Sequence, residues 1–238
     1  MTRIGPNTLL PARRRSLTLT TADGERLAAE LALPEGEPRA TVVLVHPNPT
    51  GGGSMDTHVI RKAAARLPAL AGIATLRFNT RGTVSESGAS TGTHDAGVAE
   101  AHDLAAAVAA VADLPGVWLA GWSFGTDVVL MHGSRDDVRG AFLLAPTMRR
   151  TRPEHLAAWA RSGKPVRCVV PEFDDYLRPD AAAVRFAGVP QAEIITFPGC
   201  KHLFVGHAER ALDSLVDLVA PDVPTPLPGE WPDQTAEV

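Results

Sequence analysis

Cysteine is scarce in this sequence. Two cysteines, Cys168 and Cys200, are too few for a disulfide framework in a chain of 238 residues. The first fifteen residues contain Pro6, Pro11 and several arginines, but not the apolar core that a secretory signal requires. No apolar run approaches the roughly 20 residues that cross a bilayer. These absences predict a cytoplasmic protein that does not insert into a membrane.

Several binding signatures are also missing. The net charge of −4 favours neither nucleic acid nor an anionic membrane as a partner. No G-x-G-x-x-G follows an early strand, and the glycines at 51–53 lack the lysine of a phosphate-binding loop. The adjacent pairs His94-Asp95 and His102-Asp103 lack the i, i+4 spacing of a helical metal site. We therefore expect neither a cofactor nor a metal.

The sequence does contain a short strand that breaks at a glycine-flanked serine. The apolar run Val117–Ala120 leads into Gly121-Trp122-Ser123-Phe124-Gly125, and helix-compatible residues follow at 127–132. G-x-S-x-G between a strand and a helix is typical of a nucleophile elbow. The glycines permit the sharp turn, which holds the hydroxyl at a helix N-terminus where backbone N–H groups stabilise negative charge. Ser123 is therefore the predicted nucleophile.

Strands and helices alternate around this turn. Alternating polar and apolar residues on both sides of Asp23-Gly24 predict an antiparallel hairpin over 16–33. The sequence then predicts strands at 40–45, 73–78, 117–120, 140–145, 165–170 and 192–197, and helices at 56–70, 96–114, 127–132, 153–162, 179–186 and 207–219. This order is typical of an α/β fold with a mostly parallel central sheet and helices on both faces. Residues 147–164 leave room for a crossover helix but not for a cap domain.

The predicted domain boundaries follow from these elements. A single domain is expected over 16–219, with no internal repeat. An N-terminal segment, 1–15, precedes it. Five prolines in 220–238 prevent the last helix from continuing, which predicts an extended or mobile surface tail.

Five short motifs together resemble the α/β-hydrolase superfamily, and in particular its small capless bacterial hydrolases with a His-Pro-x-Pro loop. The resemblance covers residues from about 17 to 219 and implies an α/β-hydrolase fold. The motifs are His46-Pro47-Asn48-Pro49 with the glycines at 51–53, Arg77 to Gly82, Gly121 to Gly125, Glu172-Phe173-Asp174, and Lys201-His202.

The resemblance implies a catalytic triad in the chain order serine, acid, histidine. Asp174 and Asp175 both follow a predicted strand. Asp174 is favoured by alignment with the family's Gly-x-x-Asp-x-x-x-Pro pattern, although Pro171 replaces the glycine and Pro179 lies five residues, not four, after Asp174. Asp175 stays open as the alternative. His202 follows the last predicted strand and is the expected base, with His207 at the start of the closing helix as its alternative.

The same resemblance implies an oxyanion hole made of two backbone N–H groups. One comes from Phe124, directly after the nucleophile. The other is expected from Asn48, because its proline neighbours at 47 and 49 have no N–H. We expect His46 to support this loop through hydrogen bonds, and Arg81 to tie down a neighbouring turn.

These residues predict a serine hydrolase that cleaves a small-molecule carboxylic ester or thioester through an acyl-enzyme intermediate. Two alternatives stay open. The same fold and triad can serve as an acyltransferase, a lyase or a peptidase, and the chain can be a catalytically inactive binding protein. The sequence does not distinguish ester from thioester and does not determine the oligomeric state.

Overall fold

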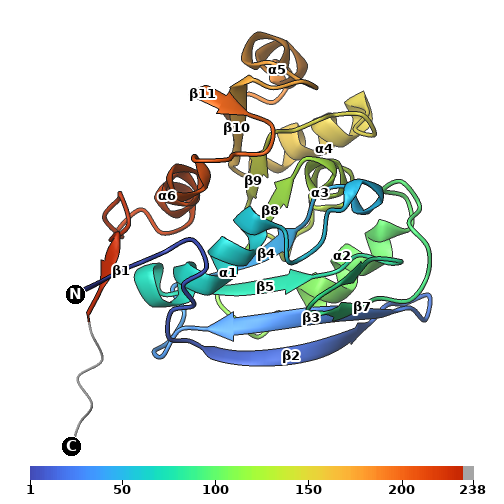
Figure 1. The fold of residues 1–238 in the computed structure, drawn as a ribbon. Helices are drawn as coiled ribbons and strands as arrows, with labels where there is room; N and C mark the ends of the chain where they lie inside the picture. Colours follow the sequence, from blue (N-terminus) through green and yellow to red (C-terminus); the bar gives the residue numbers. More distant parts are fainter. Residues whose placement is uncertain (233–238) are drawn as a thin grey trace, which may run out of the picture.

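An eight-stranded sheet forms the centre of the protein in a computed structural model that describes residues 1–232 (Figure 1). The strand order is β11-β10-β9-β8-β4-β5-β3-β2. Neighbours from β11 to β5 run parallel, whereas β3 is antiparallel to both β5 and β2. The strands are β2 (Arg13–Thr20), β3 (Arg26–Leu33), β4 (Ala40–Val45), β5 (Ile73–Phe78), β8 (Val117–Trp122), β9 (Ala141–Leu144), β10 (Val166–Phe173) and β11 (Ala192–Lys201). The predicted mostly parallel sheet with an N-terminal antiparallel hairpin is confirmed.

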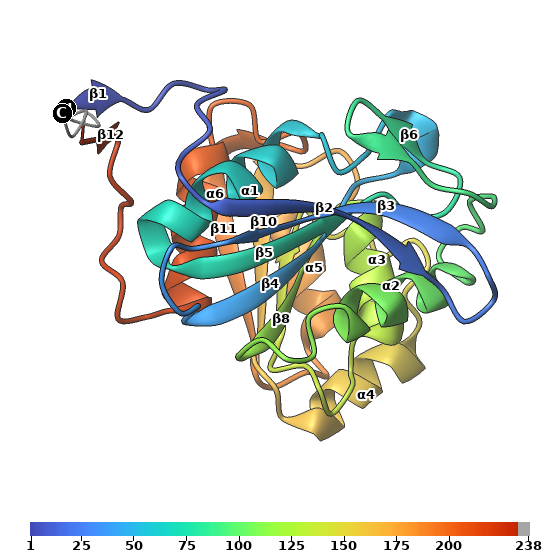
Figure 2. The same cartoon turned by 90° about the horizontal axis from the view of Figure 1, so that it is seen from below.

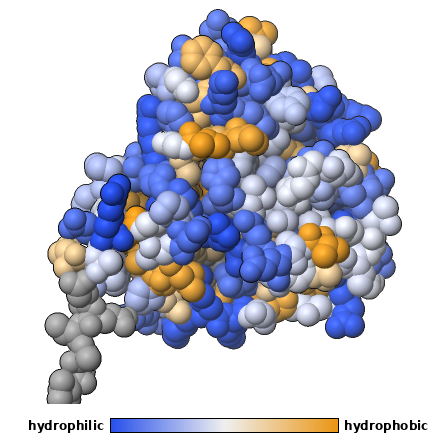
Figure 3. All heavy atoms as spheres, viewed as in Figure 1, coloured by the Kyte–Doolittle hydropathy of each residue, from blue (hydrophilic) through white to orange (hydrophobic). Residues whose placement is uncertain are grey.

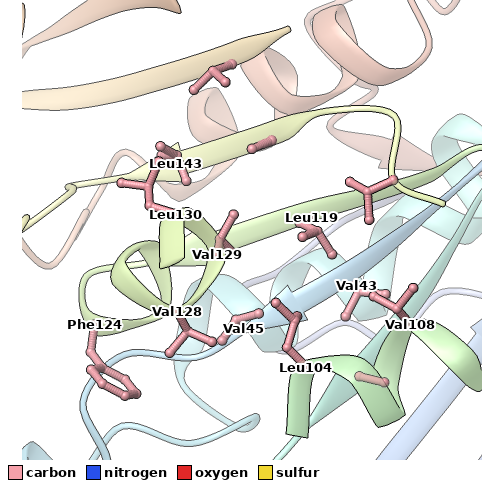
Figure 4. Packing of buried hydrophobic residues seen from close by; sticks show 14 of the residues in the cluster. Val43, Val45, Leu104, Val108, Leu119, Phe124, Val128, Val129, Leu130 and Leu143 are labelled. Carbon is pink, nitrogen blue, oxygen red and sulfur yellow. The ribbon is translucent and has the colours of Figure 1, made fainter. Parts of the chain in front are cut away.

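Helices cover both faces of this sheet (Figure 2). They are α1 (His58–Ala71), α2 (Glu100–Ala109), α3 (Phe124–His132), α4 (Pro153–Ser162), α5 (Pro179–Phe186) and α6 (Ala208–Val219). Every residue of β4 is buried, and its side chains alternate between two cores. Val42 and Leu44 pack with α1 and α6, whereas Val43 and Val45 pack with α2 and α3. Figure 4 shows the second core, with Leu104 of α2 beside these valines.

The predicted helix over 96–114 is too long at both ends. Its N-terminal part is excluded because Ala96 and Gly97 have φ of 52° and 99°, which a right-handed helix does not accommodate. After Ala109 the chain continues as turns up to Leu114. The alanine-rich composition had favoured helix throughout on local propensity alone.

Two predicted strands are longer than expected, and their extensions meet. β10 continues to Phe173 and β11 to Lys201, so residues 199–201, predicted as loop, belong to a strand. The pairing shifts after Pro171↔Phe197 through an irregularity, and the next pair is Phe173↔Lys201. Cys200, which lies beyond the predicted strand at 192–197, is part of this longer strand and is buried.

The terminal segments lie side by side (Figures 1 and 2). The short strand β1 (Thr2–Arg3) pairs antiparallel with β12 (Glu230–Trp231). Leu227 packs against the core, and its N–H donates to Asp213 Oδ1 at 2.8 Å. β2 begins at Arg13, slightly before the predicted boundary. The three-part division at 16 and 219 stays a prediction, and residues 233–238 of the predicted tail lie outside the described residues.

The described surface is predominantly polar on the face seen in Figure 3, where hydrophobic side chains form small separate groups. None of the helices within residues 1–232 combines the length and the apolar character needed to cross a bilayer.

Candidate active site

Ser123 sits at a sharp turn between β8 and α3. Its backbone has φ 54° and ψ −118°, a strained conformation for a residue with a side chain, costing about 1–3 kcal/mol. Hydrogen bonds hold it there: its N–H donates to Leu144 O at 2.9 Å, and its carbonyl accepts from Thr126 N at 2.9 Å. Hydrogen bonds to Leu144 of β9 and Thr126 of α3 therefore hold the backbone of Ser123 in this turn.

The two glycines of the elbow are required by close backbone contacts. A Cβ on Gly121 would lie 2.4 Å from the carbonyl oxygen of Gly125, and a Cβ on Gly125 would lie 2.2 Å from that of Val45. Neither carbonyl can move without disrupting the strand or the helix to which it belongs. Both positions thus need glycine because any side chain there would overlap a backbone carbonyl oxygen.

The structure brings three of the predicted site residues into one chain of hydrogen bonds. Ser123 Oγ lies 2.8 Å from His202 Nε2, and His202 Nδ1 lies 2.8 Å from Asp174 Oδ2. The other carboxylate oxygen, Asp174 Oδ1, accepts from the backbone N–H groups of Tyr176 and Leu177 at 2.8 and 3.1 Å. This geometry fits a neutral imidazole whose Nδ1–H donates to the carboxylate and whose Nε2 accepts the serine proton.

The alternative residues occupy different environments. Asp175 is exposed, whereas the carboxylate of Asp174 is buried against His202. His207 occupies the position that precedes the first turn of α6, and it is His202 that contacts Ser123. The sequence left both choices open, and the geometry favours Asp174 and His202.

Aromatic residues hold the histidine loop in place. Trp122, directly before Ser123, is buried, and its Nε1–H donates to the carbonyl oxygen of His202 at 3.2 Å. The ring of Tyr176 lies against the His202 ring, with 4.5 Å between centroids. Sequence reasoning missed Tyr176, whose only signal was its position two residues after Asp174.

The two candidate oxyanion donors lie at the same cavity as Ser123. Phe124 is the first residue of α3, and Asn48 begins a short 3-10 helix over Pro49–Gly51. Within residues 1–232, neither backbone N–H donates to another protein group, which leaves both available to a ligand. The side-chain oxygen of Asn48 is already occupied, because it accepts from Thr50 N at 3.2 Å and from Thr50 Oγ1 at 3.1 Å.

The loop that carries Asn48 is folded tightly onto itself. Gly53 N–H donates to Asn48 O at 2.9 Å, and a Cβ on Gly53 would lie 2.2 Å from Pro47 O. His46 anchors the loop to the end of β5: its Nδ1 lies 2.6 Å from Pro47 O, and its Nε2 accepts from Thr80 N at 3.0 Å. Burial lowers the pKa of His46 to about 4, so the imidazole is neutral near pH 7. The expected supporting role of His46 is confirmed.

Arg81 ties three parts of the fold together behind the site. Its guanidinium contacts Asp103 on α2 at 2.7 Å and Asp23 in the β2–β3 hairpin at 2.8 Å. These contacts confirm the expected role of Arg81 in holding a turn through carboxylates. Asp103 is thereby used in an ion pair, and no cluster of three or more His, Cys, Asp or Glu side chains in the described part of the chain is arranged to hold a metal.

A cavity of about 580 Å³ opens in front of Ser123. Asn48, Phe124 and Tyr176 line its wall beside the nucleophile, and Arg149 and Arg150 line it as well. The reactive hydroxyl therefore faces a space large enough for a small organic ligand.

Among known proteins, the chain is similar to solved structures. No protein-family model matches the sequence, and no curated protein matches it. Among solved structures, the chain is similar to a lidless α/β serine hydrolase from Xanthomonas campestris, with 27% identity, 92% of this chain and 99% of that chain covered, and a TM-score of 0.73. It is also similar to an α/β serine hydrolase homologue from Coxiella burnetii, with 28% identity, 88% and 97% covered, and a TM-score of 0.69.

A more distant structure shares the fold. An esterase from Pyrococcus furiosus has 16% identity and a TM-score of 0.73, with 89% of this chain and 93% of that chain covered. At this identity the likeness concerns the fold alone. All three similarities extend over most of both chains.

Proposed function

We propose that this chain, which belongs to the α/β-hydrolase superfamily, is a serine hydrolase that cleaves a carboxylic ester or thioester through an acyl-enzyme intermediate. The observation that carries the proposal is the chain of hydrogen bonds from Ser123 through His202 to Asp174, with both distances at 2.8 Å. A serine hydroxyl is a weak nucleophile unless a base within this distance removes its proton during attack.

Acylation begins when Ser123 Oγ attacks the carbonyl carbon of the substrate. The Oγ–C bond forms, the hydroxyl proton moves to His202 Nε2, and the carbonyl electrons move onto oxygen. Asp174 stabilises the resulting imidazolium and keeps Nδ1 protonated. When the tetrahedral intermediate collapses, the bond to the leaving alcohol or thiol breaks, and His202 supplies its proton.

Deacylation repeats the sequence with water as the nucleophile. His202 takes a proton from the water as its oxygen bonds to the acyl carbon. The bond to Ser123 Oγ then breaks, and the proton returns to that oxygen. The carboxylic acid leaves, and the serine is restored.

Negative charge develops on the carbonyl oxygen in both steps. The free N–H groups of Phe124 and Asn48 are suited to bind it, with further support from the N-terminus of α3. Donors fixed by the fold do not reorganise during the reaction, and removing one such donor typically costs about 10²–10³ in rate.

The test is covalent labelling with a fluorophosphonate probe, read by intact mass. We expect one adduct on the wild type, none on Ser123→Ala, and strongly slowed labelling of His202→Ala. His207→Ala is the matched control and should label at the wild-type rate. No adduct on folded wild type would overturn the proposal and favour the inactive binding protein.

Turnover assays then distinguish the chemistries that share an activated serine. We expect hydrolysis of p-nitrophenyl acetate, an ester, or of S-acetylthiocholine, a thioester. Labelling without net hydrolysis of either, but with acyl transfer to an added alcohol or amine, would instead assign an acyltransferase.

A further inference from the structure

Two arginines at the cavity in front of Ser123 have no carboxylate partner among residues 1–232. Arg149 and Arg150 line it, and both are exposed. Within residues 1–232, neither guanidinium forms an ion pair, whereas Arg152, two residues further along, contacts Glu154 at 3.9 Å. An unpaired guanidinium at the wall of a ligand cavity is available to a ligand.

One carboxylate of residues 1–232 lines this cavity, and its oxygens already accept hydrogen bonds from the protein. Asp127 on α3 is buried, and each of its oxygens accepts several hydrogen bonds. The hydroxyl groups of Thr147 and Thr151 donate to it at 2.7 and 2.6 Å. The backbone N–H groups of Arg149, Arg150 and Thr151 donate at 3.3, 3.1 and 2.8 Å. Asp127 therefore fixes the backbone from which both arginine side chains extend.

His94 also lines the cavity, and it already has a carboxylate neighbour. His94 Nδ1 lies 2.7 Å from Glu100 Oε1. The carboxylate of Glu100 is fully buried and also accepts from the backbone N–H groups of Asp95 and Gly97 at 3.1 and 2.9 Å. Both carboxylates, Asp127 and Glu100, are thus held by groups of the protein, whereas within residues 1–232 the guanidiniums of Arg149 and Arg150 form no ion pair and can contact a ligand.

Arg149 lies close to the reacting groups. Its Cζ is 5.5 Å from the centroid of the Tyr176 ring, and that ring lies 4.5 Å from the ring of His202. One aromatic ring thus separates the guanidinium from the proposed base. The contact with the ring orients the guanidinium without neutralising its charge.

We propose that this cavity selects substrates that carry a negative charge, with Arg149 and Arg150 binding a carboxylate or a similar oxyanion near the scissile bond. This inference rests on the proposed hydrolase function and narrows its substrate class. A guanidinium presents several N–H donors in a planar fork that matches an oxyanion. The chain as a whole is acidic, with a net charge of −4, so the positive charge at this cavity does not reflect its overall composition.

The experiment compares esters that are matched in size and differ in charge. Mono-p-nitrophenyl adipate carries a carboxylate in its acyl part, and methyl p-nitrophenyl adipate is its neutral counterpart. A second pair places the charge on the alcohol side: 4-acetoxybenzoate against its methyl ester. We expect kcat/KM to favour the anionic ester about tenfold in at least one pair, mainly through a lower KM, and to lose this preference at high salt.

Charge-removing variants test the two arginines. In Arg149→Gln and Arg150→Gln the anionic-to-neutral ratio of kcat/KM should fall severalfold, and in the double variant it should approach one. Arg161→Gln, which removes an exposed charge on α4 away from the cavity, should keep the wild-type ratio. Equal kcat/KM for the charged and neutral esters of both pairs would overturn the inference while leaving the hydrolase function intact. Failure to cleave any of the four esters or to react with the fluorophosphonate would instead count against the proposed function itself.

Discussion

Phe173 of β10 pairs with Lys201 of β11, and this pairing brings together the two residues that follow them, Asp174 and His202. The strands are in simple parallel register up to Pro171↔Phe197. Between this pair and the last pair, Phe173↔Lys201, β11 contains three residues and β10 contains one. The hydrogen bond of 2.8 Å between the carboxylate and the imidazole depends on this irregularity.

Gly199 lies within this irregularity, and its conformation can be tested against a matched glycine. Gly199 has φ +69°, whereas Gly188 has no such constraint, and a Cβ at either position would contact nothing within 4 Å. We expect Gly199→Ala to lower the free energy of unfolding by about 1 kcal/mol through backbone strain alone. Gly188→Ala should not lower it. Urea unfolding measures both, and equal effects would contradict the role of the backbone at Gly199.

The choice between the adjacent aspartates predicts unequal effects on activity. Asp174→Asn should lower kcat/KM for p-nitrophenyl acetate by roughly 10³–10⁴-fold, because an amide facing Nδ1 favours the wrong imidazole tautomer. Asp175→Asn, at an exposed side chain, should stay within about twofold of wild type. Circular dichroism checks that both variants fold. A larger loss in Asp175→Asn would assign the acid to the other residue.

The close contact at the elbow predicts a severe effect on stability. Gly125→Ala would place a Cβ 2.2 Å from Val45 O in β4, so we expect a loss of at least about 3 kcal/mol in the free energy of unfolding, or failure to fold. Gly51→Ala is the control, because its nearest contact would be 4.0 Å, to Asn48 Nδ2. Denaturant unfolding of the two variants side by side measures the difference. A Gly125→Ala protein as stable as the control would show that the elbow can relax.

The lowered pKa of buried His46 predicts that the stability of the fold depends on pH. Burial lowers its pKa to about 4 in the folded protein, below the ordinary value of 6.5, so the unfolded chain binds this proton more tightly. Neutral His46 therefore adds to the free energy of unfolding. This contribution is complete above about pH 6.5, decreases as the pH falls, and is lost by about pH 4. The total change is about 3 kcal/mol.

A variant isolates this contribution from other groups. Burial also lowers the pKa values of His58 and His132, so both add to the same trend in the wild type. The quantity to measure is the difference in unfolding free energy between wild type and His46→Gln at several pH values. We expect this difference to shrink between pH 6.5 and 4. A constant difference would show that His46 does not titrate in this way.

Features that depend on a few neighbouring residues could be predicted from the sequence. The run 40–45 corresponds residue for residue to β4, because a strand covered on both faces is built mainly from apolar side chains. The glycines around Ser123 indicated the elbow because the G-x-S-x-G motif occupies five consecutive residues, although the close contact at Gly125 comes from Val45 O in β4. The hairpin around Gly24 was likewise a local signal, and it is confirmed.

Features that depend on distant residues were decided only by the tertiary structure. Asp174 and Asp175 are neighbours with the same chemistry, and only the packing of β10 against β11 directs one of them toward His202. The anchoring of the 147–151 loop by Asp127 joins residues about twenty positions apart through backbone N–H groups, which leave no trace in side-chain composition. The exposure of Arg149 beside Tyr176 likewise arises where two strand ends meet. Hydrogen bonding and charge at a site depend on which groups the fold brings together, and a single sequence does not specify those distances.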